Sequence, residues 1–330
     1  MRGARATKCE VVQPRSARTH QPPPRYRFRF RFGRAPVLET LDHIVVAAED
    51  IDSAERQAVS LLGRTPAWAG RHSALGTRNA VFRLANTAIE LVAPDGEGPG
   101  ADALRQWLEG QRAPGLMGLV FGTPNAAAET QRLREAGLSP SDPSPGLAQD
   151  ERSGAFRRFN QATLPVEETH GVRLSLIEDL TETELIPPSL PVASEEAVVS
   201  RVDHVVVQTS DPERALDLYG ARLGLRLALD RSFEKRGVRL LFFRVGGLTV
   251  EVASRLAKSP AAEDTGLGHA DHLWGVAYQV VDIDQAYRRM AEAGFELTSI
   301  RDGHKPGTRV FSVRGDPLGI PTLVIEPVAD

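Results

Sequence analysis

Two stretches, "LDHIVVAAED" at residues 41–50 and "VDHVVVQTSD" at residues 202–211, decide the fold because they repeat one pattern. Each is a short run of apolar, mostly β-branched residues with one histidine at its start. Such runs are typical of buried strands. The chain therefore contains an internal duplication, and a search for further copies sets the domain organisation.

Four segments of the chain share one order of elements: a strand, a helix and then further strands. The expected first strands are residues 41–48, 115–123, 201–209 and 273–281. Asp52 and Asp211 are the expected N-caps of the first and third helices. Each helix ends near a glycine that suits a left-handed C-cap, and these glycines are Gly63, Gly137, Gly224 and Gly294.

The later strands complete the repeat. A strand opening with Gly-x-Arg is expected at 76–84, 237–245 and 307–313, and the last strands at 87–94, 172–179, 248–254 and 321–327. The sequence therefore predicts an α+β protein of four βαβββ modules. The expected domains are residues 37–180 and 200–330, two modules each, joined by a linker at 181–199 that is rich in Pro and acidic residues.

Composition is ordinary for a globular protein, with 330 residues, 41% of them hydrophobic and 25% charged. The net charge of −3 hides an asymmetry: residues 1–34 hold ten Lys/Arg and one acid, so the remainder carries 30 basic and 42 acidic residues. A body that acidic argues against a nucleic-acid partner. No apolar run reaches the ~18 residues of a membrane span, and the single Cys9 excludes an internal disulfide. We expect a cytoplasmic protein with no membrane partner.

The first residues form a separate basic extension, expected at 1–36. Arginine alternates with aromatic residues in "RYRFRFRF" at 25–32. This pattern fits an edge strand, a nucleic-acid-binding arm, a transit peptide or a disordered extension. We predict disorder and leave the other three readings open.

Two histidine–glutamate pairs stand out in the repeat. His43 precedes Glu90 by 47 residues, His204 precedes Glu251 by 47, and the two pairs are offset by 161 (204 − 43 and 251 − 90). Imidazole and carboxylate together suit a divalent first-row metal. Alternatively, each His hydrogen-bonds its Glu, or each Glu faces solvent. The corresponding positions of the second and fourth modules are Gly118, Ser175, Gly275 and Leu323.

The chain resembles the vicinal oxygen chelate superfamily, which includes glyoxalase I, extradiol dioxygenases, methylmalonyl-CoA epimerase and the fosfomycin- and bleomycin-resistance proteins. The resemblance covers residues ~37–330 and rests on "LDHIVVAAEDID", "AIELVAP", "VDHVVVQTSDPERALDLYGARLGLRL", "LTVEVA" and "DPLGIPTLVIEP". "GRHSALGTRNAVFRL" is similar to the glyoxalase-like subgroup. The resemblance implies two cupped, barrel-like domains, each built from two modules.

The resemblance also implies a function and a site. His43, Glu90, His204 and Glu251 fall at positions where the family places metal ligands, for Fe, Mn, Ni or Zn, and either Glu would also serve as a catalytic base. With the usual module pairing each cup would hold one His and one Glu, so a four-ligand set requires module one to face module three or cups to meet between subunits. The implied activity is that of a metal-dependent lyase, isomerase or dioxygenase acting on a small molecule with adjacent oxygens. The alternative is a metal-free binding or resistance protein, and a homodimer is left open.

Further polar residues are candidates for the same sites. His269 or His272 would supply a missing metal ligand unless each is simply a solvated loop histidine. A second group of basic residues would hold an anionic part of the substrate or form ordinary charged loops; it comprises Arg71, His72, His304, Lys305 and Arg309. "GEGPG" at 96–100 predicts a plain turn, and the sequence contains neither a P-loop nor an HExxH motif.

Overall fold

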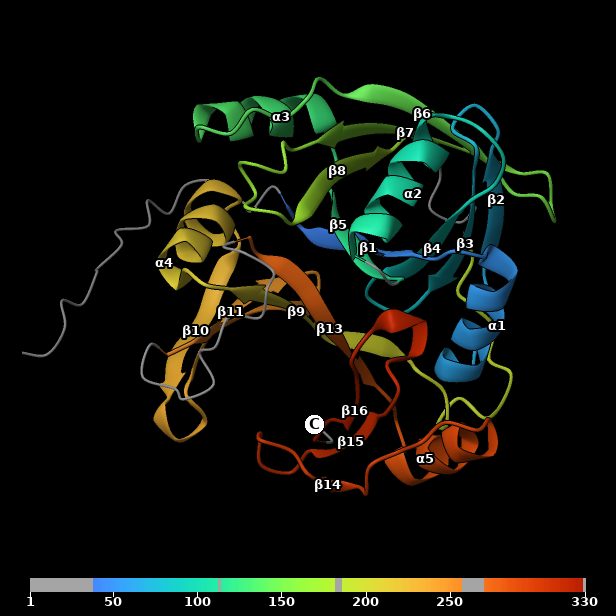
Figure 1. Cartoon of the computed structure of the whole chain (residues 1–330), viewed down its shortest axis with the longest axis vertical. Coiled ribbons are helices and arrows are strands. Elements are labelled where there is room, and N and C mark those ends of the chain that lie inside the picture. The colour runs from blue at the N-terminus through green and yellow to red at the C-terminus, as the bar shows by residue number, and fades with distance from the viewer. Residues whose placement is uncertain (1–37, 112–113, 182–185, 257–269, 329–330) are drawn as a thin grey trace, which may run out of the picture. The chain divides into compact units, whose positions relative to one another are not determined.

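The computed structural model describes residues 38–111, 114–181, 186–256 and 270–328 (Figure 1). The predicted extension at 1–36 and the candidate His269 lie outside these residues. Residues Pro36–Asp330 form one compact unit. None of the helices in the described ranges is long and apolar enough to cross a membrane.

Four modules of the predicted kind are present. The first consists of β1 (Thr40–Ala47), α1 (Ile51–Leu62), β2 (Trp68–His72), β3 (Thr77–Arg83) and β4 (Ala88–Pro94). The second consists of β5 (Gly115–Gly122), α3 (Ala126–Glu135), β6 (Ser144–Gln149), β7 (Phe156–Thr163) and β8 (Arg173–Asp179). Helix α2 (Pro99–Gln111) connects them.

The second half repeats this order. The third module consists of β9 (Arg201–Thr209), α4 (Pro212–Ala215), the π-helical η2 (Leu216–Arg222), β10 (Arg226–Phe233), the short η3 (Glu234–Arg236), β11 (Val238–Val245) and β12 (Leu248–Arg255). The fourth consists of β13 (His272–Gln279), α5 (Ile283–Glu292), β14 (Arg301–Asp302), β15 (Arg309–Val313), the short η4 (Pro317–Gly319) and β16 (Thr322–Glu326).

Two eight-stranded sheets result, in the orders β2-β3-β4-β1-β5-β8-β7-β6 and β10-β11-β12-β9-β13-β16-β15-β14. In each sheet the first strands of two modules pair antiparallel at the centre. The usual pairing of modules one with two and three with four is therefore present. The predicted α+β fold of four βαβββ modules in two cupped domains is confirmed.

The two sheets differ in how their edges end. In the N-terminal sheet the edge strands β2 and β6 meet through a bridge between Gly70 and Asp150, and the Asp150 side chain accepts a hydrogen bond of 2.9 Å from the Ala69 amide. This sheet is nearly a closed barrel. In the C-terminal sheet no bridge joins β10 to β14 among the described residues, so that sheet is an open cup.

The helix ends follow the sequence signals with two corrections. Helix α1 has Asp50, not the predicted Asp52, as its N-cap, because the Asp50 side chain accepts a hydrogen bond of 2.7 Å from the Ser53 amide. Asp211 caps α4 as predicted. The "GEGPG" stretch makes its turn through Gly96 and Gly98, both with positive φ, but then starts helix α2, which the sequence analysis missed.

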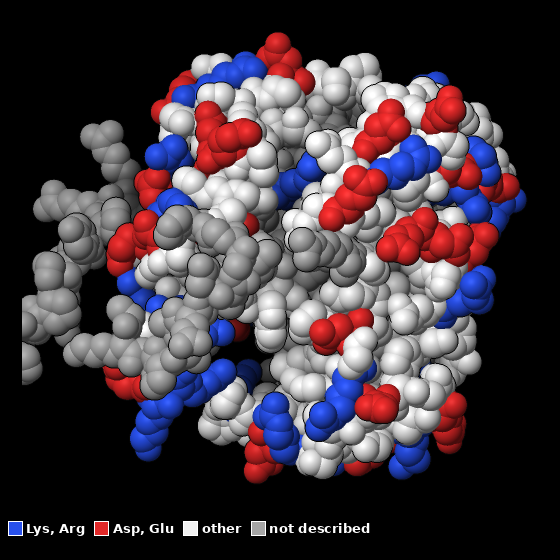
Figure 2. All heavy atoms as spheres, viewed as in Figure 1, with Lys and Arg blue, Asp and Glu red and all other residues white. Residues whose placement is uncertain are grey.

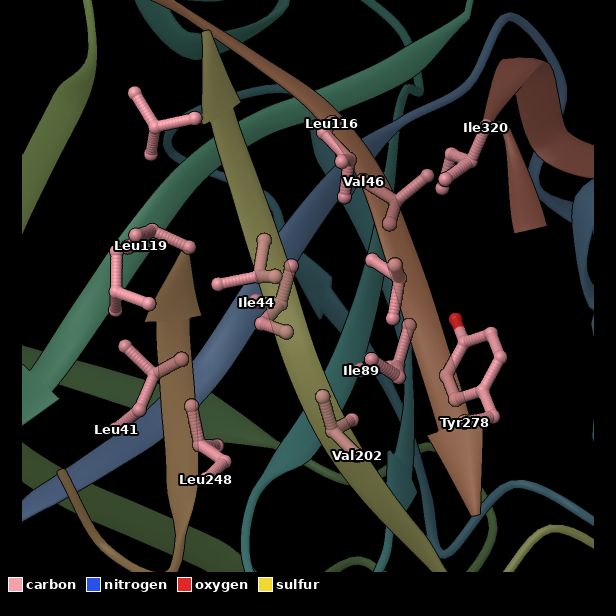
Figure 3. Packing of buried hydrophobic residues seen from close by; sticks show 14 of the residues in the cluster. Leu41, Ile44, Val46, Ile89, Leu116, Leu119, Val202, Leu248, Tyr278 and Ile320 are labelled. Carbon is pink, nitrogen blue, oxygen red and sulfur yellow. The ribbon is translucent and has the colours of Figure 1, made fainter. Parts of the chain in front are cut away.

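The main core lies between the two sheets (Figure 3). Side chains from β1 and β5 pack against side chains from β9 and β13, and the cluster includes Ile44, Val46, Leu119, Val202 and Tyr278. Side chains alternate between the two faces along each strand, so the residues next to these core positions point to the opposite face of each sheet. The outer faces of the two sheets thus pack together, while the inner faces point away from each other.

Two arginines connect the halves in a reciprocal manner. Arg289 of α5 donates to the Ser60 and Leu61 carbonyls at the end of α1, at 2.5 and 2.7 Å. Arg132 of α3 donates to the Arg222 and Leu223 carbonyls at the end of η2, at 2.9 and 3.2 Å. Each helix end thereby receives donors for carbonyls that have no partner within the helix.

Candidate functional sites in the two cups

A β-bulge shapes the start of both first strands. In β1 the register shifts between Leu41 and His43, and in β9 it shifts opposite Ala277 and Tyr278, so that one extra residue is accommodated each time. The extra residues are Asp42 and Asp203. Because a bulge redirects side chains, each Asp lies beside the following His and contacts its Nδ1 atom at 2.7 Å.

The N-terminal pair is a tight ion pair. His43 Nε2 lies 3.1 Å from Glu90 Oε2, and both side chains are largely buried. Burial disfavours both charges, but the attraction between the two groups outweighs it. The pKa of His43 is raised to about 9, with Asp42 adding to the effect, and the pKa of Glu90 is lowered to about 2. The pair is therefore charged at neutral pH.

A neighbouring amide completes the N-terminal site. Asn79 of β3 donates from Nδ2 to Glu90 Oε1 at 2.5 Å. Both carboxylate oxygens of Glu90 are thus occupied by partners within the protein. Helix α2 covers part of the same inner face, with Leu104 and Leu108 packed against Ala47. In the N-terminal cup the Glu90 carboxylate is therefore fully paired, whereas the Oδ1 atom of Asn79 is buried without a hydrogen-bond partner.

The C-terminal pair has the same residues but a looser geometry. His204 Nε2 lies 3.9 Å from Glu251 Oε2, which is beyond hydrogen-bond distance. The position that matches Asn79, offset by the same 161 residues, is Leu240. No described residue donates a hydrogen bond to the Glu251 carboxylate. Burial therefore raises the pKa of Glu251, and the attraction of His204 only partly offsets it. The pKa of His204 is raised, because its contact with Asp203 outweighs its burial.

The two pairs do not form one shared site within the chain. Ile44 and Val46 belong to the core between the sheets, so His43 points to the other face of β1. Val205 belongs to the same core, and His204 likewise points away from it. The four-ligand set that would need module one to face module three is therefore not formed.

The described residues also do not fit a metal site with three protein ligands, the usual minimum for a catalytic zinc-type centre. They contain no group of three or more His, Cys, Asp or Glu side chains placed to hold a metal ion. The registers confirm that Gly118, Ser175, Gly275 and Leu323 occupy the matching positions of modules two and four. His272, at the start of β13, is half-buried, and its pKa is lowered by burial. Its role as a ligand stays a prediction.

The predicted anion-binding residues lie in different places. Arg71 contacts Asp95 at 2.6 Å and Glu151 at 3.0 Å. Arg309 contacts Asp284 of α5 at 2.8 Å, on the face of the sheet opposite the cup. His72 is close enough to Glu90 to favour its charged form, and exposed His304 does the same for Glu251. Lys305 is exposed beside His304. The roles of these five residues as substrate ligands stay predictions.

The sequence analysis missed three residues that shape these sites. Asp42 and Asp203 were visible in both quoted stretches, directly before each His, and their repetition was a usable signal. The third residue is Asn79, and its replacement by Leu240 in the second half was visible in the paired "GTRNAVFRL" and "GVRLLFFRV" strands. The sequence alone did not show that positions 79 and 240 lie beside the glutamates, because that depends on strand register.

The fold and the two sites define a protein of paired βαβββ modules with a His–Glu pair in each cup. A family model described as "Glyoxalase-like domain" matches residues 41–191, and one described as "Glyoxalase/Bleomycin resistance protein/Dioxygenase superfamily" matches residues 201–321. The chain belongs to the vicinal oxygen chelate superfamily. A comparison with curated proteins gave no match.

Solved structures share the fold over most of the chain. A mutant 4-hydroxymandelate synthase from Streptomyces coelicolor is similar with a TM-score of 0.64 and 19% identity, covering 88% of this chain and 94% of the synthase. The Mn(II)-bound glyoxalase from Novosphingobium aromaticivorans is similar with a TM-score of 0.57 and 13% identity, covering 89% of this chain and 83% of the glyoxalase. At these identities the likeness concerns the fold.

Proposed function

We propose that the chain is an enzyme acting on a small molecule in its C-terminal cup, with Glu251 as the group that accepts a proton from that molecule. The observation that carries the proposal is the difference between the two cups. Glu90 is held by Asn79 and His43, whereas Glu251 has neither an amide partner nor a short contact with His204. A carboxylate whose pKa is raised by burial is a better base at neutral pH than one whose pKa is about 2.

The arrangement suits proton abstraction next to a carbonyl group. Glu251 accepts the proton of the C–H bond, and the electron pair of that bond moves toward the carbonyl oxygen. His204 is oriented by Asp203 at its Nδ1, which leaves Nε2 directed toward Glu251. A protonated His204 then donates a hydrogen bond to the developing oxyanion. Return of the proton to carbon or to another atom gives an isomerase- or lyase-type outcome.

The cofactor prediction is kept separate from this step. The family resemblance implies a divalent metal cofactor, Fe, Mn, Ni or Zn. One similar structure is described as Mn(II)-bound. Each pair here supplies two ligands, so the proposed proton transfer assigns no role to a metal. Elemental analysis after growth with all four metals present tests the prediction. About one metal per chain that is lost in both His43→Ala and His204→Ala would support a shared site, and by the geometry above that site would be between subunits.

The test of the proposed function is exchange of substrate hydrogen with solvent. The protein in D₂O is incubated with a panel of 2-oxo acids, 1,2-dicarbonyls and their thiol adducts, and deuterium at the adjacent carbon is followed by NMR. We expect exchange with the native chain and with Glu90→Gln, and loss of at least 100-fold in Glu251→Gln. Equal rates in Glu90→Gln and Glu251→Gln, or a greater loss in Glu90→Gln, would overturn the proposal.

A second candidate is a cytoplasmic protein that binds a small molecule in the same cup without catalysis. It is favoured by the two-ligand donor set, since a three-ligand metal site is not formed by the described residues. Binding that is detected through Trp274, which is half-exposed on β13, with no deuterium exchange by any panel member, would support this candidate over the enzyme.

A further inference from the structure

The inner face of the C-terminal cup carries several arginines. Register places them: Arg231 of β10 pairs with Leu240, and Arg244 of β11 pairs with Thr249 of β12, on the face that also holds Glu251. On the opposite wall Arg301 of β14 pairs with Val310, which packs in the inner cluster with Ala277 and Leu323. Cations therefore line both walls of the cup.

These arginines contact aromatic or hydroxyl groups of the protein but are not neutralised by a carboxylate. Arg231 and Arg236 lie over the Phe233 ring, at 5.0 and 5.8 Å from its centroid, and Arg244 donates to the Thr249 hydroxyl at 2.6 Å. None of Arg231, Arg236, Arg244 and Arg301 forms an ion pair with an Asp or Glu of the described residues. Stacking on an aromatic ring orients a guanidinium group without neutralising it.

The outer face of the same strands shows the opposite arrangement. Arg239 of β11 contacts Asp230 of β10 at 2.8 Å and Glu213 of α4 at 2.6 Å. Arg231, which follows Asp230 on β10 and lies on the inner face, has no such partner among the described residues. Figure 2 shows the surface hollowed between the β10–β11 wall and the β15–β16 wall, with Lys and Arg gathered beside the hollow.

The inner face also has an apolar part. Leu240 and Phe242 of β11 lie on it beside Glu251, and Leu323 and Ala277 lie across the cup. Among the residues that the structure describes, the carboxylates on this face are Glu251 and Asp203, and Asp203 is already bound to His204 and Gln279. In the described part of the cup, guanidinium groups therefore outnumber carboxylates, and they lie beside apolar side chains of β11, β13 and β16.

We infer that the molecule bound in the C-terminal cup is an organic anion: an apolar, preferably aromatic, body with a carboxylate or phosphate group that Arg231, Arg236 and Arg301 receive. Guanidinium groups bind both kinds of anion through paired hydrogen bonds. The apolar part lies against Phe242 and Leu240, next to Glu251. This inference rests on the proposed function only for the choice of cup, and it names the class of ligand.

The test uses three matched probes: phenylacetate, phenyl phosphate and the neutral phenylacetamide. Their affinities for the full chain are measured by calorimetry and by Trp274 fluorescence at 20 and 200 mM salt. We expect one or both anions to bind at least tenfold more tightly than the amide, and to weaken at high salt. Arg231→Gln and Arg301→Gln each weaken the anion about tenfold, whereas Arg239→Gln, on the outer face, leaves it unchanged. The tighter of the two anions identifies the acid group.

Several results would overturn the inference. Equal affinity for phenylacetamide and the anions, or weakening by Arg239→Gln as large as by Arg231→Gln, would show that charge on the inner face does not select the ligand. Absence of binding by all three probes at 10 mM would also overturn it. The proposed function is judged separately, by deuterium exchange in Glu251→Gln, so an uncharged substrate that exchanges would refute this inference alone.

Discussion

Replacing Arg289 with methionine tests how the two halves are held together. In the native protein Arg289 donates three hydrogen bonds, to the carbonyls of Ser60, Leu61 and Ala197. Bonds from a charged donor contribute about 1.5–3 kcal/mol each, or roughly 5–9 kcal/mol together. Burial lowers the pKa of Arg289 to about 10 from 12.5, which corresponds to roughly 3 kcal/mol of lost hydration.

The balance predicts that Arg289→Met lowers the free energy of unfolding by about 2–6 kcal/mol. Methionine keeps the apolar contacts of the side-chain stem, so the loss reports the hydrogen bonds. The assay is urea unfolding followed by circular dichroism and tryptophan fluorescence. Exposed Arg288 on the same helix is the matched control, and Arg288→Met should stay within about 0.5 kcal/mol of the native chain. A loss below 1 kcal/mol in Arg289→Met would refute the reasoning.

Three further predictions concern single positions. Asn79→Leu copies the C-terminal cup into the N-terminal one and should lower the free energy of unfolding by about 2 kcal/mol in urea titrations, whereas no loss would show that the amide bond is not needed. Gly319→Ala adds a Cβ that overlaps the Pro114 carbonyl oxygen at a positive φ, and should lower the melting temperature more than Gly137→Ala, where φ is also positive but nothing is near. The pKa of His43 is raised to about 9, so the roughly 3 kcal/mol that its charged form adds to stability is complete below pH 6.5 and is lost as the pH rises through 9. His43→Gln should therefore flatten the profile of unfolding free energy between pH 6 and 10. Parallel profiles for the native chain and the variant would contradict this.

The sequence predicted the fold well because the fold depends on local and repeated signals. Apolar runs, N-capping residues and C-capping glycines recur in all four modules, and the strands in the middle of each sheet follow them. The edge strands β2, β6, β10 and β14 and the inner strand β7 were not predicted, since they are polar or short. Helix α2 was missed although Ala101, Leu104 and Leu108 mark its buried face.

The candidate site was only partly predictable. His43 with Glu90 and His204 with Glu251 were selected correctly as neighbours, because parallel pairing of the first and last strands puts them together. Their different geometries could not be read, since they depend on which residue of the adjacent strand lies diagonally beside each Glu, Asn79 in one sheet and Leu240 in the other. The same limit applies to Arg231 and Arg301, whose common face follows from strand register.

The open edges of the C-terminal sheet have a consequence for solubility. An unpaired edge strand can template pairing with another chain and so begin aggregation. The N-terminal barrel avoids this by joining β2 to β6. In the open cup no strand of the described residues pairs with the outer edge of β10 or β14. Both strands carry charges: Arg226, Asp230 and Arg231 lie along β10, while β14 consists only of Arg301 and Asp302. The arginines assigned to ligand binding therefore also keep this sheet from growing by strand addition, and neutralising several of them together is expected to promote self-association.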